Sequence, residues 1–448
     1  MSSRPLHAVL LPPEPGGGRL LGLLSAALDG TGPALLPLDP GLPAAWLAEV
    51  LSRFAPSAIE TPDGTERIAP AGPGRDGGGG VGPDIAVLVA TSGSTGAPKG
   101  VQLSAAALRA SAAASLSRIG APPAPPGAPP APASAAPRAG RRWLCCLPGF
   151  HVAGLQVLVR SLLAGTEPVV AGHVDAEVVA GAGCAYVSLV PTQLRRLLDT
   201  GAPLAAFDAI LLGGAAPPAG LLADAEAAGA RVITTYGMSE TCGGCVYDGR
   251  PLDGVRVRLS DRGLIGISGP VLFSGYWSAQ PGGSASGGPA PGGSASGGSA
   301  AGGSAPGGAA SGSGLDDGWF WTSDLGVLDD TGRLTVRGRA DDVINSGGEK
   351  VVPGEVEAVL GTLDGVRDVV ILGMPDSEWG EIVTAVIVPE DPGVPPELAR
   401  LRAQARERLP GFAAPRRLIL VAEIPMLASG KPDRQALRAA AADQGERA

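Results

Sequence analysis

Residues 84–100, DIAVLVATSGSTGAPKG, place an apolar run directly before a loop of glycines, hydroxyl side chains and one lysine. The run 84–90 predicts a buried strand, and Ser104 is a suitable N-cap for a helix over 105–118. Glycines let backbone N–H groups approach an anion, the hydroxyls donate hydrogen bonds, and Lys99 adds a positive charge. The loop therefore has the chemistry of a phosphate site, although the G-x-x-x-x-G-K-[ST] spacing of a Walker A motif is absent.

Strand and helix patterns alternate after this loop, which predicts a mostly parallel sheet covered by helices. We expect strands at 143–148, 185–190, 208–214 and 231–237, and helices at 151–165, 193–199 (capped by Thr192) and 218–229. Ligands bind beyond the carboxyl ends of the strands in such sheets. The loops that should cluster there are 91–100, 148–151, 213–217 and 236–241.

The pattern changes after residue 250. Residues 255–270 and the hairpin 319–339 predict a small antiparallel unit, and 281–314 is a Gly/Ser/Ala/Pro run that we interpret as a disordered insertion. A compact α+β unit follows. The predicted fold is α/β, with a large N-terminal domain over 1–338 that binds acyl group and ATP, and a small, mobile, hinged α+β domain over 339–448.

Composition excludes several functions. The 448 residues carry a net charge of −9 without a basic cluster, which argues against nucleic acid as a partner. No apolar run approaches the roughly 18 residues of a membrane span, and the N-terminus is a poor signal peptide. The five cysteines suggest a reducing, cytoplasmic compartment, and we expect Cys242 and Cys245 to be small wall residues, since nothing completes a metal site.

Lysine is rare: Lys99, Lys350 and Lys431 stand against 31 arginines. A lysine that persists in such a chain suits a position that needs a compact ammonium rather than a planar guanidinium.

The loop 91–100 resembles the phosphate-binding signature of the acyl-adenylate-forming superfamily, which includes acyl- and aryl-CoA ligases, luciferases and peptide-synthetase adenylation domains. Four further motifs resemble the family's signatures and occur in the family order: YGMSET at 236–241, TSDLG at 322–326, GRADD at 338–342 and SGK at 429–431. The family usually has glycine where Ser323 stands, and we expect little effect.

The resemblance implies ATP, Mg²⁺ and coenzyme A as ligands. It implies that Lys431 is the adenylating lysine, that Glu240 helps to hold Mg²⁺, that Asp341 is the hinge, and that Gly347, Gly348 and Lys350 face CoA. The nucleotide-binding residues that it implies are Thr91, Ser92, Gly93, Ser94, Thr95, Gly96, Lys99, Gly213, Gly214, Ala215, Tyr236, Gly237, Met238, Ser239, Thr241, Asp324 and Arg339.

Within the superfamily, residues 236–255, 187–199 and 211–218 resemble the o-succinylbenzoate–CoA ligases of menaquinone synthesis. That resemblance implies adenylation of 2-succinylbenzoate with release of pyrophosphate, followed by transfer to CoA with release of AMP. His151, in LPGFHVAGL at 147–155, resembles the position beside the acyl group, and Ser188 and Gly244 are further candidate wall residues of the substrate pocket.

Three alternatives stay open at this point. The chain could be another aryl- or fatty-acid–CoA ligase, an adenylating enzyme that loads a carrier protein, or a non-catalytic nucleotide-binding homologue. The retained Glu240, Asp324 and Lys431 argue against the last. We expect a small carboxylic acid, ATP and CoA as partners, without membrane insertion, and the oligomeric state is left open, homo-oligomer included.

Overall fold

The computed structural model describes residues 3–13, 17–68, 80–92, 98–121, 141–277, 314–427 and 430–445. Several positions named above therefore lie outside the described residues: Gly93, Ser94, Thr95, Gly96, Ser429 and nearly all of the insertion 281–314. So does nearly all of the Pro/Ala-rich stretch 119–140, which we interpret from its sequence as a flexible or polyproline loop.

An eight-stranded mixed sheet forms the N-terminal part of the molecule. Its order is β17-β7-β6-β2-β1-β3-β4, and β5 pairs with β1. The strands are β1 Arg4–Val9, β2 Ala34–Pro37, β3 Ala58–Thr61, β4 Gly64–Arg67, β5 Gly80–Val81, β6 Ile85–Ser92, β7 Pro98–Ser104 and β17 Gly275–Tyr276, accompanied by helices α1 Gly17–Leu28 and α2 Ala44–Phe54.

A seven-stranded sheet follows, in the order β14-β13-β12-β11-β10-β8-β9. Its strands are β8 Trp143–Cys145, β9 Val169–Val170, β10 Tyr186–Leu189, β11 Ala209–Leu212, β12 Val232–Met238, β13 Gly243–Tyr247 and β14 Arg250–Pro251. The associated helices are α3 Ala105–Ile119, α4 Val152–Ala164, α5 Ala176–Ala182, α6 Pro191–Asp199 and α7 Leu221–Ala227, with 3₁₀ turns η1 Leu204–Ala206 and η2 Ser239–Thr241.

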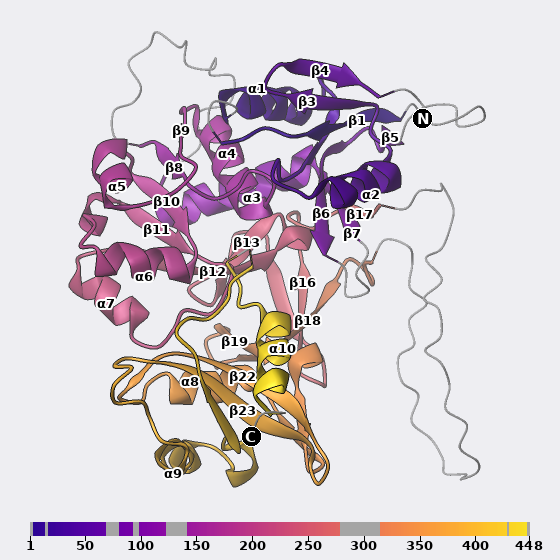
Figure 1. Cartoon of the computed structure of the whole chain (residues 1–448). Helices are drawn as coiled ribbons and strands as arrows, with labels where there is room; N and C mark the ends of the chain where they lie inside the picture. The colour runs from indigo at the N-terminus through magenta and orange to yellow at the C-terminus, as the bar shows by residue number, and fades with distance from the viewer. Residues whose placement is uncertain are drawn as a thin grey trace, which may run out of the picture.

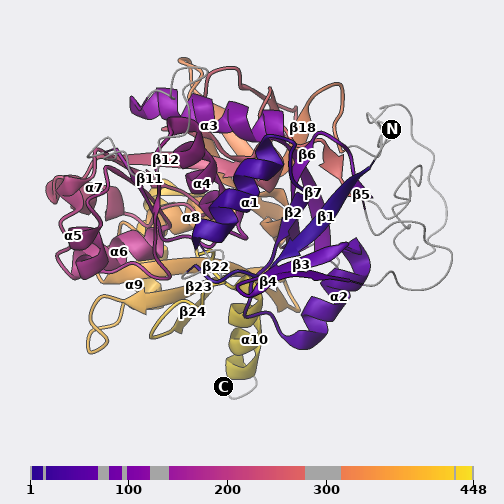
Figure 2. The ribbon, with the colours of Figure 1, turned by 90° about the horizontal axis from the view of Figure 1, so that it is seen from above.

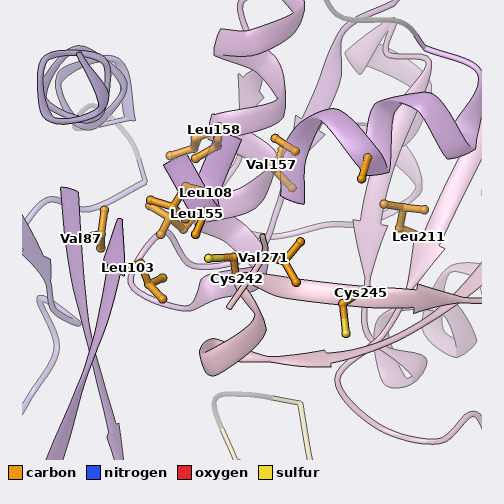
Figure 3. Packing of buried hydrophobic residues seen from close by; sticks show 14 of the residues in the cluster. Val87, Leu103, Leu108, Leu155, Val157, Leu158, Leu211, Cys242, Cys245 and Val271 are labelled. Carbon is orange, nitrogen blue, oxygen red and sulfur yellow. The ribbon is translucent and has the colours of Figure 1, made fainter. Parts of the chain in front are cut away.

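Helices α1, α3 and α4 lie between these two sheets (Figure 2). One apolar core joins them: Leu108 of α3 and Leu155 of α4 belong to the same cluster as Val87 of β6 and Leu211 of β11 (Figure 3). Burial of this shared core holds the two sheets in a defined relative position, which matters because the candidate site takes residues from both.

Two smaller sheets complete the chain, the second in the lower body of Figure 1. The four-stranded antiparallel sheet contains β15 Arg256–Leu259, β16 Leu264–Ser268, β18 Phe320–Leu328 and β19 Leu334–Arg339. The five-stranded sheet contains β20 Ile344–Ser346, β21 Glu349–Val351, β22 Val366–Asp376, β23 Gly380–Pro389 and β24 Arg417–Leu420, with helices α8 Pro353–Leu360, α9 Leu398–Arg408 and α10 Arg434–Gly445 and turns η3 Ala340–Asp342 and η4 Gly411–Ala413.

The predicted α/β class with helix-covered sheets is confirmed, and two local details of the prediction are wrong. Residues 98–100 belong to β7, which pairs antiparallel with β6, rather than to a loop. The helix predicted over 193–199 with Thr192 as its cap begins two residues earlier, at Pro191, with Val190 as N-cap. Proline suits the first helical position, since its missing N–H has no intrahelical partner there.

Cys242 and Cys245, expected as small wall residues, belong to the apolar core. Both are fully buried, and their sulfur atoms point in different directions in Figure 3. Burial raises the pKa of Cys245 to about 12, so its thiol is neutral and unreactive at physiological pH.

Candidate active site

The carboxyl ends of β8, β10, β11 and β12 lie at one edge of the seven-stranded sheet, because these strands are parallel. The loops that leave this edge contain His151, the start of α6, the turn 213–215 and η2. This is the clustering predicted for 148–151, 213–217 and 236–241. The loop 91–100 instead connects the two strands of the β6–β7 hairpin in the other sheet.

Two glycines at this edge have no room for a side chain. A Cβ on Gly213 would lie 2.3 Å from Oγ1 of Thr235, and a Cβ on Gly237 would lie 2.0 Å from the carbonyl oxygen of Gly243. The Thr241 hydroxyl fixes the following turn by accepting from the Met238 N–H at 2.9 Å and donating to the Gly243 carbonyl at 2.7 Å. Close backbone packing therefore explains why the motif 236–241 needs these small and hydroxyl residues.

Tyr236 and Asp324 meet across two sheets. The Tyr236 hydroxyl, from β12, donates to Oδ2 of Asp324, from β18, at 2.7 Å. Asp324 is also paired in register with Arg339 at the end of β19, so three residues of three separate motifs converge. Burial, followed by the charge of Asp324, raises the pKa of Tyr236, and the phenol remains a hydrogen-bond donor at neutral pH.

Tyr276 contacts both Glu240 and Lys99 of the β6–β7 hairpin. The Tyr276 hydroxyl donates to Oε1 of Glu240 at 2.9 Å, and Nζ of Lys99 lies 5.8 Å from the centre of the Tyr276 ring. Lys99 itself is exposed and pairs with Thr91 across the hairpin. The side chain of Ser92 lies outside the described residues.

A Mg²⁺ site built on Glu240 is chemically consistent with this arrangement. Within the described residues, no group of three or more His, Cys, Asp or Glu side chains could hold a metal ion. Mg²⁺ is commonly bound through one or two carboxylates together with substrate phosphates, and such a site needs only a carboxylate placed near a phosphate-binding loop. Glu240 offers a carboxylate whose hydrogen-bond partner, Tyr276, lies against Lys99 of the predicted phosphate loop.

The loop that carries Lys431 extends from the lower body to the seven-stranded sheet (Figure 1). Hydrogen bonds from Leu427 N–H to the Lys431 carbonyl and from Gly430 N–H to the Leu427 carbonyl, both 2.8 Å, close it into a tight turn. Gly430 has a φ of +77°, and a Cβ there would lie 2.8 Å from Cγ1 of Val190. The loop therefore contacts the start of α6, with Lys431 exposed beside the predicted site.

The remaining predicted positions of the C-terminal part lie apart from that turn. Arg339 and Asp341 form an exposed ion pair of 3.1 Å at the end of β19. Gly347 and Gly348 form the β20–β21 turn, which packs against Trp379, and Lys350 is exposed on β21. Arg367 of β22 lies 3.9 Å from Asp199 of α6, which adds a charged contact between the two bodies.

His151 begins α4, and the structure leaves one of its nitrogens without a partner. Its Nε2 is buried and makes no hydrogen bond, while its ring centre lies 4.7 Å from that of Phe150. Burial lowers the pKa of His151 below its ordinary value, and the nearby charge of Asp39 offsets this only in part. The imidazole is therefore neutral at pH 7 and can hydrogen-bond to a ligand.

Ser188 contacts a residue that the sequence reading missed. Arg160 of α4 is buried and donates to the Ser188 hydroxyl at 2.9 Å and to the Ser115 hydroxyl at 3.3 Å. The Arg160 guanidinium lies 4.3 Å from the centre of the Trp143 ring, and its Nε has no hydrogen-bond acceptor. Within the described residues, no carboxylate forms an ion pair with Arg160. Gly244 lies in β13 opposite Gly237, and two strands, β12 and β11, separate it from Ser188 in β10.

The sequence contained a signal for Arg160. It is the only charged residue in the helix 152–164, which is otherwise apolar or small apart from one glutamine and one serine. A lone arginine in such a helix requires either a buried anion or a ligand. Tyr276 had no comparable signal, because its contacts with Glu240 and Lys99 depend on the pairing of distant strands.

Two family models match the chain. The AMP-binding enzyme model covers residues 27–277, and the AMP-binding enzyme C-terminal domain model covers residues 355–431. The chain belongs to the AMP-binding enzyme family. The membership predicted from the five motifs is thus confirmed.

Curated relatives within the AMP-binding enzyme family include 2-succinylbenzoate–CoA ligases. The chain is 40% identical over 369 residues to a probable 2-succinylbenzoate–CoA ligase of Mycobacterium tuberculosis, covering 79% of this chain and 84% of that protein. It is 31% identical over 374 residues to the 2-succinylbenzoate–CoA ligase of Bacillus licheniformis, covering 78% and 68% of the two chains.

Solved structures of AMP-binding enzymes share the fold. The R195K variant of E. coli MenE with bound OSB-AMS matches with a TM-score of 0.71 and 26% identity, covering 98% of this chain and 88% of that one. The o-succinylbenzoate CoA synthetase of Bacillus subtilis in complex with OSB-AMP matches with a TM-score of 0.71 and 24% identity, covering 97% and 88%. Helices long and apolar enough to cross a membrane are absent from the described part of the chain.

Proposed function

We propose that this protein is a 2-succinylbenzoate–CoA ligase that uses ATP, Mg²⁺ and CoA. In the first half-reaction a carboxylate oxygen attacks the α-phosphorus of ATP and pyrophosphate leaves. In the second, the CoA thiolate attacks the acyl carbonyl, and AMP leaves with the electron pair of the broken C–O bond. Family membership and the named relatives support this chemistry.

The adenosine end of ATP would be held where the three motifs converge. The Tyr236 ring would stack on adenine against the turn 213–215, and the ribose hydroxyls would reach Asp324 and Arg339. The Tyr236–Asp324 hydrogen bond of 2.7 Å supports this assignment because it orients both side chains before the nucleotide binds.

Adenylation must bring two anions together, the substrate carboxylate and the α-phosphate. Cations and N–H groups that stabilise the charge of the transition state are the means by which enzymes achieve this. We propose that Lys431 contacts both the substrate carboxylate and the α-phosphate, and that Lys99 and the loop 91–96 bind the β- and γ-phosphates. Mg²⁺, held through Glu240, supplies further positive charge when bound. The contact of Gly430 with Val190 supports an adenylating pose of the Lys431 loop.

The buried, unpaired Arg160 is the feature that favours 2-succinylbenzoate over other carboxylic acids as the substrate. A buried guanidinium without a carboxylate partner is costly, and a substrate that brings a second carboxylate offsets that cost. 2-Succinylbenzoate has such a group, whereas a fatty acid or a simple aryl acid does not. We assign the distal carboxylate of the substrate to Arg160 and Ser188, and the reacting end to His151.

Thioester formation requires access for the thiol from the side that Lys431 occupies. We propose that residues 339–448 rotate about Asp341, withdrawing Lys431 and bringing the turn with Gly347, Gly348 and Lys350 to the site. The Arg339–Asp341 pair at the proposed hinge is exposed, so the hinge residues themselves are not fixed by burial.

A panel of acids tests the proposal. ATP- and CoA-dependent formation of AMP is measured with 2-succinylbenzoate, with a 2-alkylbenzoate that lacks the distal carboxylate, and with octanoate. We expect 2-succinylbenzoate to exceed both by at least about 100-fold in kcat/KM, the order of two to three good contacts. Preference for octanoate, or acylation of a carrier protein in place of CoA, would overturn the assignment.

A further inference from the structure

The segment 273–277 joins the phosphate-loop hairpin to Glu240. Its two-residue strand β17 pairs antiparallel with β7, and the N–H groups of Ser274 and Trp277 donate to the carbonyls of Gln102 and Gly100 at 2.9 and 2.7 Å. Contact is so close that a Cβ on Gly100 would lie 2.7 Å from the Phe54 ring and 3.0 Å from Cβ of Trp277. The segment is therefore fixed to the strand that carries Lys99.

The start of the same segment is fixed to Glu240. The Phe273 N–H donates to the Glu240 carbonyl at 2.8 Å, and the Tyr276 hydroxyl donates to the Glu240 carboxylate at 2.9 Å. The rings of Phe273 and Tyr276 meet edge to face with centres 4.9 Å apart. Tyr276 is thus held by backbone pairing on one side and by ring packing on the other.

Each part of the Tyr276 side chain faces a different charged group. The hydroxyl donates a hydrogen bond to Oε1 of Glu240. The ammonium of Lys99 lies 5.8 Å from the centre of the ring, within the roughly 6 Å over which a cation interacts with an aromatic face. Burial and the charge of Glu240 raise the pKa of Tyr276, so the hydroxyl keeps its proton.

Building on the proposed function, we propose that Tyr276 is a positioning residue that couples the metal carboxylate Glu240 to the phosphate-binding lysine Lys99. The hydrogen bond engages one carboxylate oxygen and orients the other for Mg²⁺, as outer-shell partners of metal ligands do. The ring holds the Lys99 ammonium on the same side. Metal and triphosphate are therefore captured by one connected unit.

Packing alone does not require the hydroxyl. Phenylalanine would fill the same space against Phe273 and leave the ring face for Lys99, so Tyr276→Phe removes only the contact with Glu240. Tyr276→Leu removes the ring as well. Tyr186→Phe is the matched control, because Tyr186 lies in β10 and stacks on Trp143 far along the chain from these loops.

The experiment is calorimetric titration of ATP into each full-length variant, with EDTA and then with Mg²⁺. For Tyr276→Phe we expect metal-free ATP affinity within twofold of the parent chain and an enhancement by Mg²⁺ that is smaller by about tenfold, the lower end for loss of an outer-shell hydrogen bond. Tyr276→Leu should weaken metal-free ATP binding as well, by about two- to fivefold. Tyr186→Phe should match the parent chain in both.

An unchanged Mg²⁺ enhancement in Tyr276→Phe overturns the proposal, as does a parent chain whose ATP affinity does not respond to Mg²⁺. Circular dichroism checks that Tyr276→Leu is folded. If Tyr276→Leu is not folded, the result for Tyr276→Phe alone decides whether the proposal stands. Thioester formation is scored separately with the acid panel. A parent chain that binds Mg²⁺ and ATP cooperatively but acylates no CoA would sink the proposed function and leave the role of Tyr276 supported.

Discussion

The hydroxyl of Tyr236 donates to the carboxylate of Asp324 at 2.7 Å, although the two residues lie 88 positions apart and in different sheets. The seven-stranded sheet supplies the ring and the four-stranded sheet supplies the carboxylate. In the proposed function, a nucleotide bound beside this pair would find a stacking surface and a ribose acceptor already oriented, so the entropic cost of ordering the two side chains on binding would be small.

Asp324→Asn should raise the KM for ATP by about tenfold, because hydrogen bonds to charged groups are worth ~1.5–3 kcal/mol and amide replacement keeps the shape. The effect should be the same with every acid. Asp329→Asn in the exposed β18–β19 turn provides the control. Initial-rate kinetics of pyrophosphate release measure both, and an unchanged KM for Asp324→Asn would remove the ribose assignment.

Lys431→Ala should lower adenylation by about 10²–10³-fold, the usual loss for one group that stabilises transition-state charge. Thioester formation from supplied acyl-adenylate should be spared. Lys350→Ala should show the reverse pattern, since Lys350 is assigned to the thiol step. Single-turnover assays of the two half-reactions separate the variants, and equal losses in both steps would contradict the two-pose mechanism.

Gly430→Ala should impair adenylation by roughly tenfold without lowering the melting temperature measurably. The new Cβ would lie 2.8 Å from Val190 and would require a strained φ of +77°, so the Lys431 loop would leave the start of α6. Because the loop is exposed, the rest of the fold is unaffected. Val190→Ala in the same chain should restore part of the rate, and failure of that rescue would argue that the contact is incidental.

Arg160→Met should raise the KM for 2-succinylbenzoate by at least about 30-fold, since an ion pair in a buried pocket is lost. The free energy of unfolding should stay equal or rise by ~1 kcal/mol or more, because an unpaired buried charge is replaced by an apolar chain of similar length. Arg231→Met, at an exposed arginine, is the control. A 2-alkylbenzoate without the distal carboxylate should not distinguish Arg160→Met from the parent, and a common loss with both acids would refute the assignment.

His151 gives a prediction about pH. Burial lowers its folded-state pKa below the ordinary value of 6.5, so between these two values the unfolded chain binds more protons than the folded one. Stability therefore falls as pH drops from about 6.5 into that window and is constant above it. Between pH 8 and pH 5, the melting temperature of His151→Gln should therefore fall less than that of the parent chain.

Much of the architecture could be predicted because local patterns determine it. Ser104 caps α3 as expected, its hydroxyl accepting from the Ala107 N–H at 3.1 Å, and the alternation after residue 143 reflects parallel strands buried on both faces. The motifs identified Tyr236, Glu240 and Asp324 as candidates, and the structure brings Tyr236 and Asp324 into contact.

What could not be predicted depends on long-range pairing. No local signal shows that the strand formed by 275–276 joins the sheet of residues 4–104, or that its tyrosine meets Glu240. The division of the strands into two sheets depends on how α1, α3 and α4 pack between them, which periodicity does not encode. Arg160 is the only charged residue of α4, which the sequence shows, but its burial and its lack of a carboxylate partner within the described residues depend on the packing of α4 against β8 and β10.

The late arrival of β17 has a consequence for biosynthesis. Until residue 275 has emerged from the ribosome, the outer edge of β7 has no neighbour, although β6 and β7 are complete by residue 104. An unpaired edge on an apolar sheet invites association between nascent chains. Fragments that stop short of this strand should therefore accumulate in inclusion bodies, and rapid elongation through the intervening region or chaperone capture would protect the growing polypeptide.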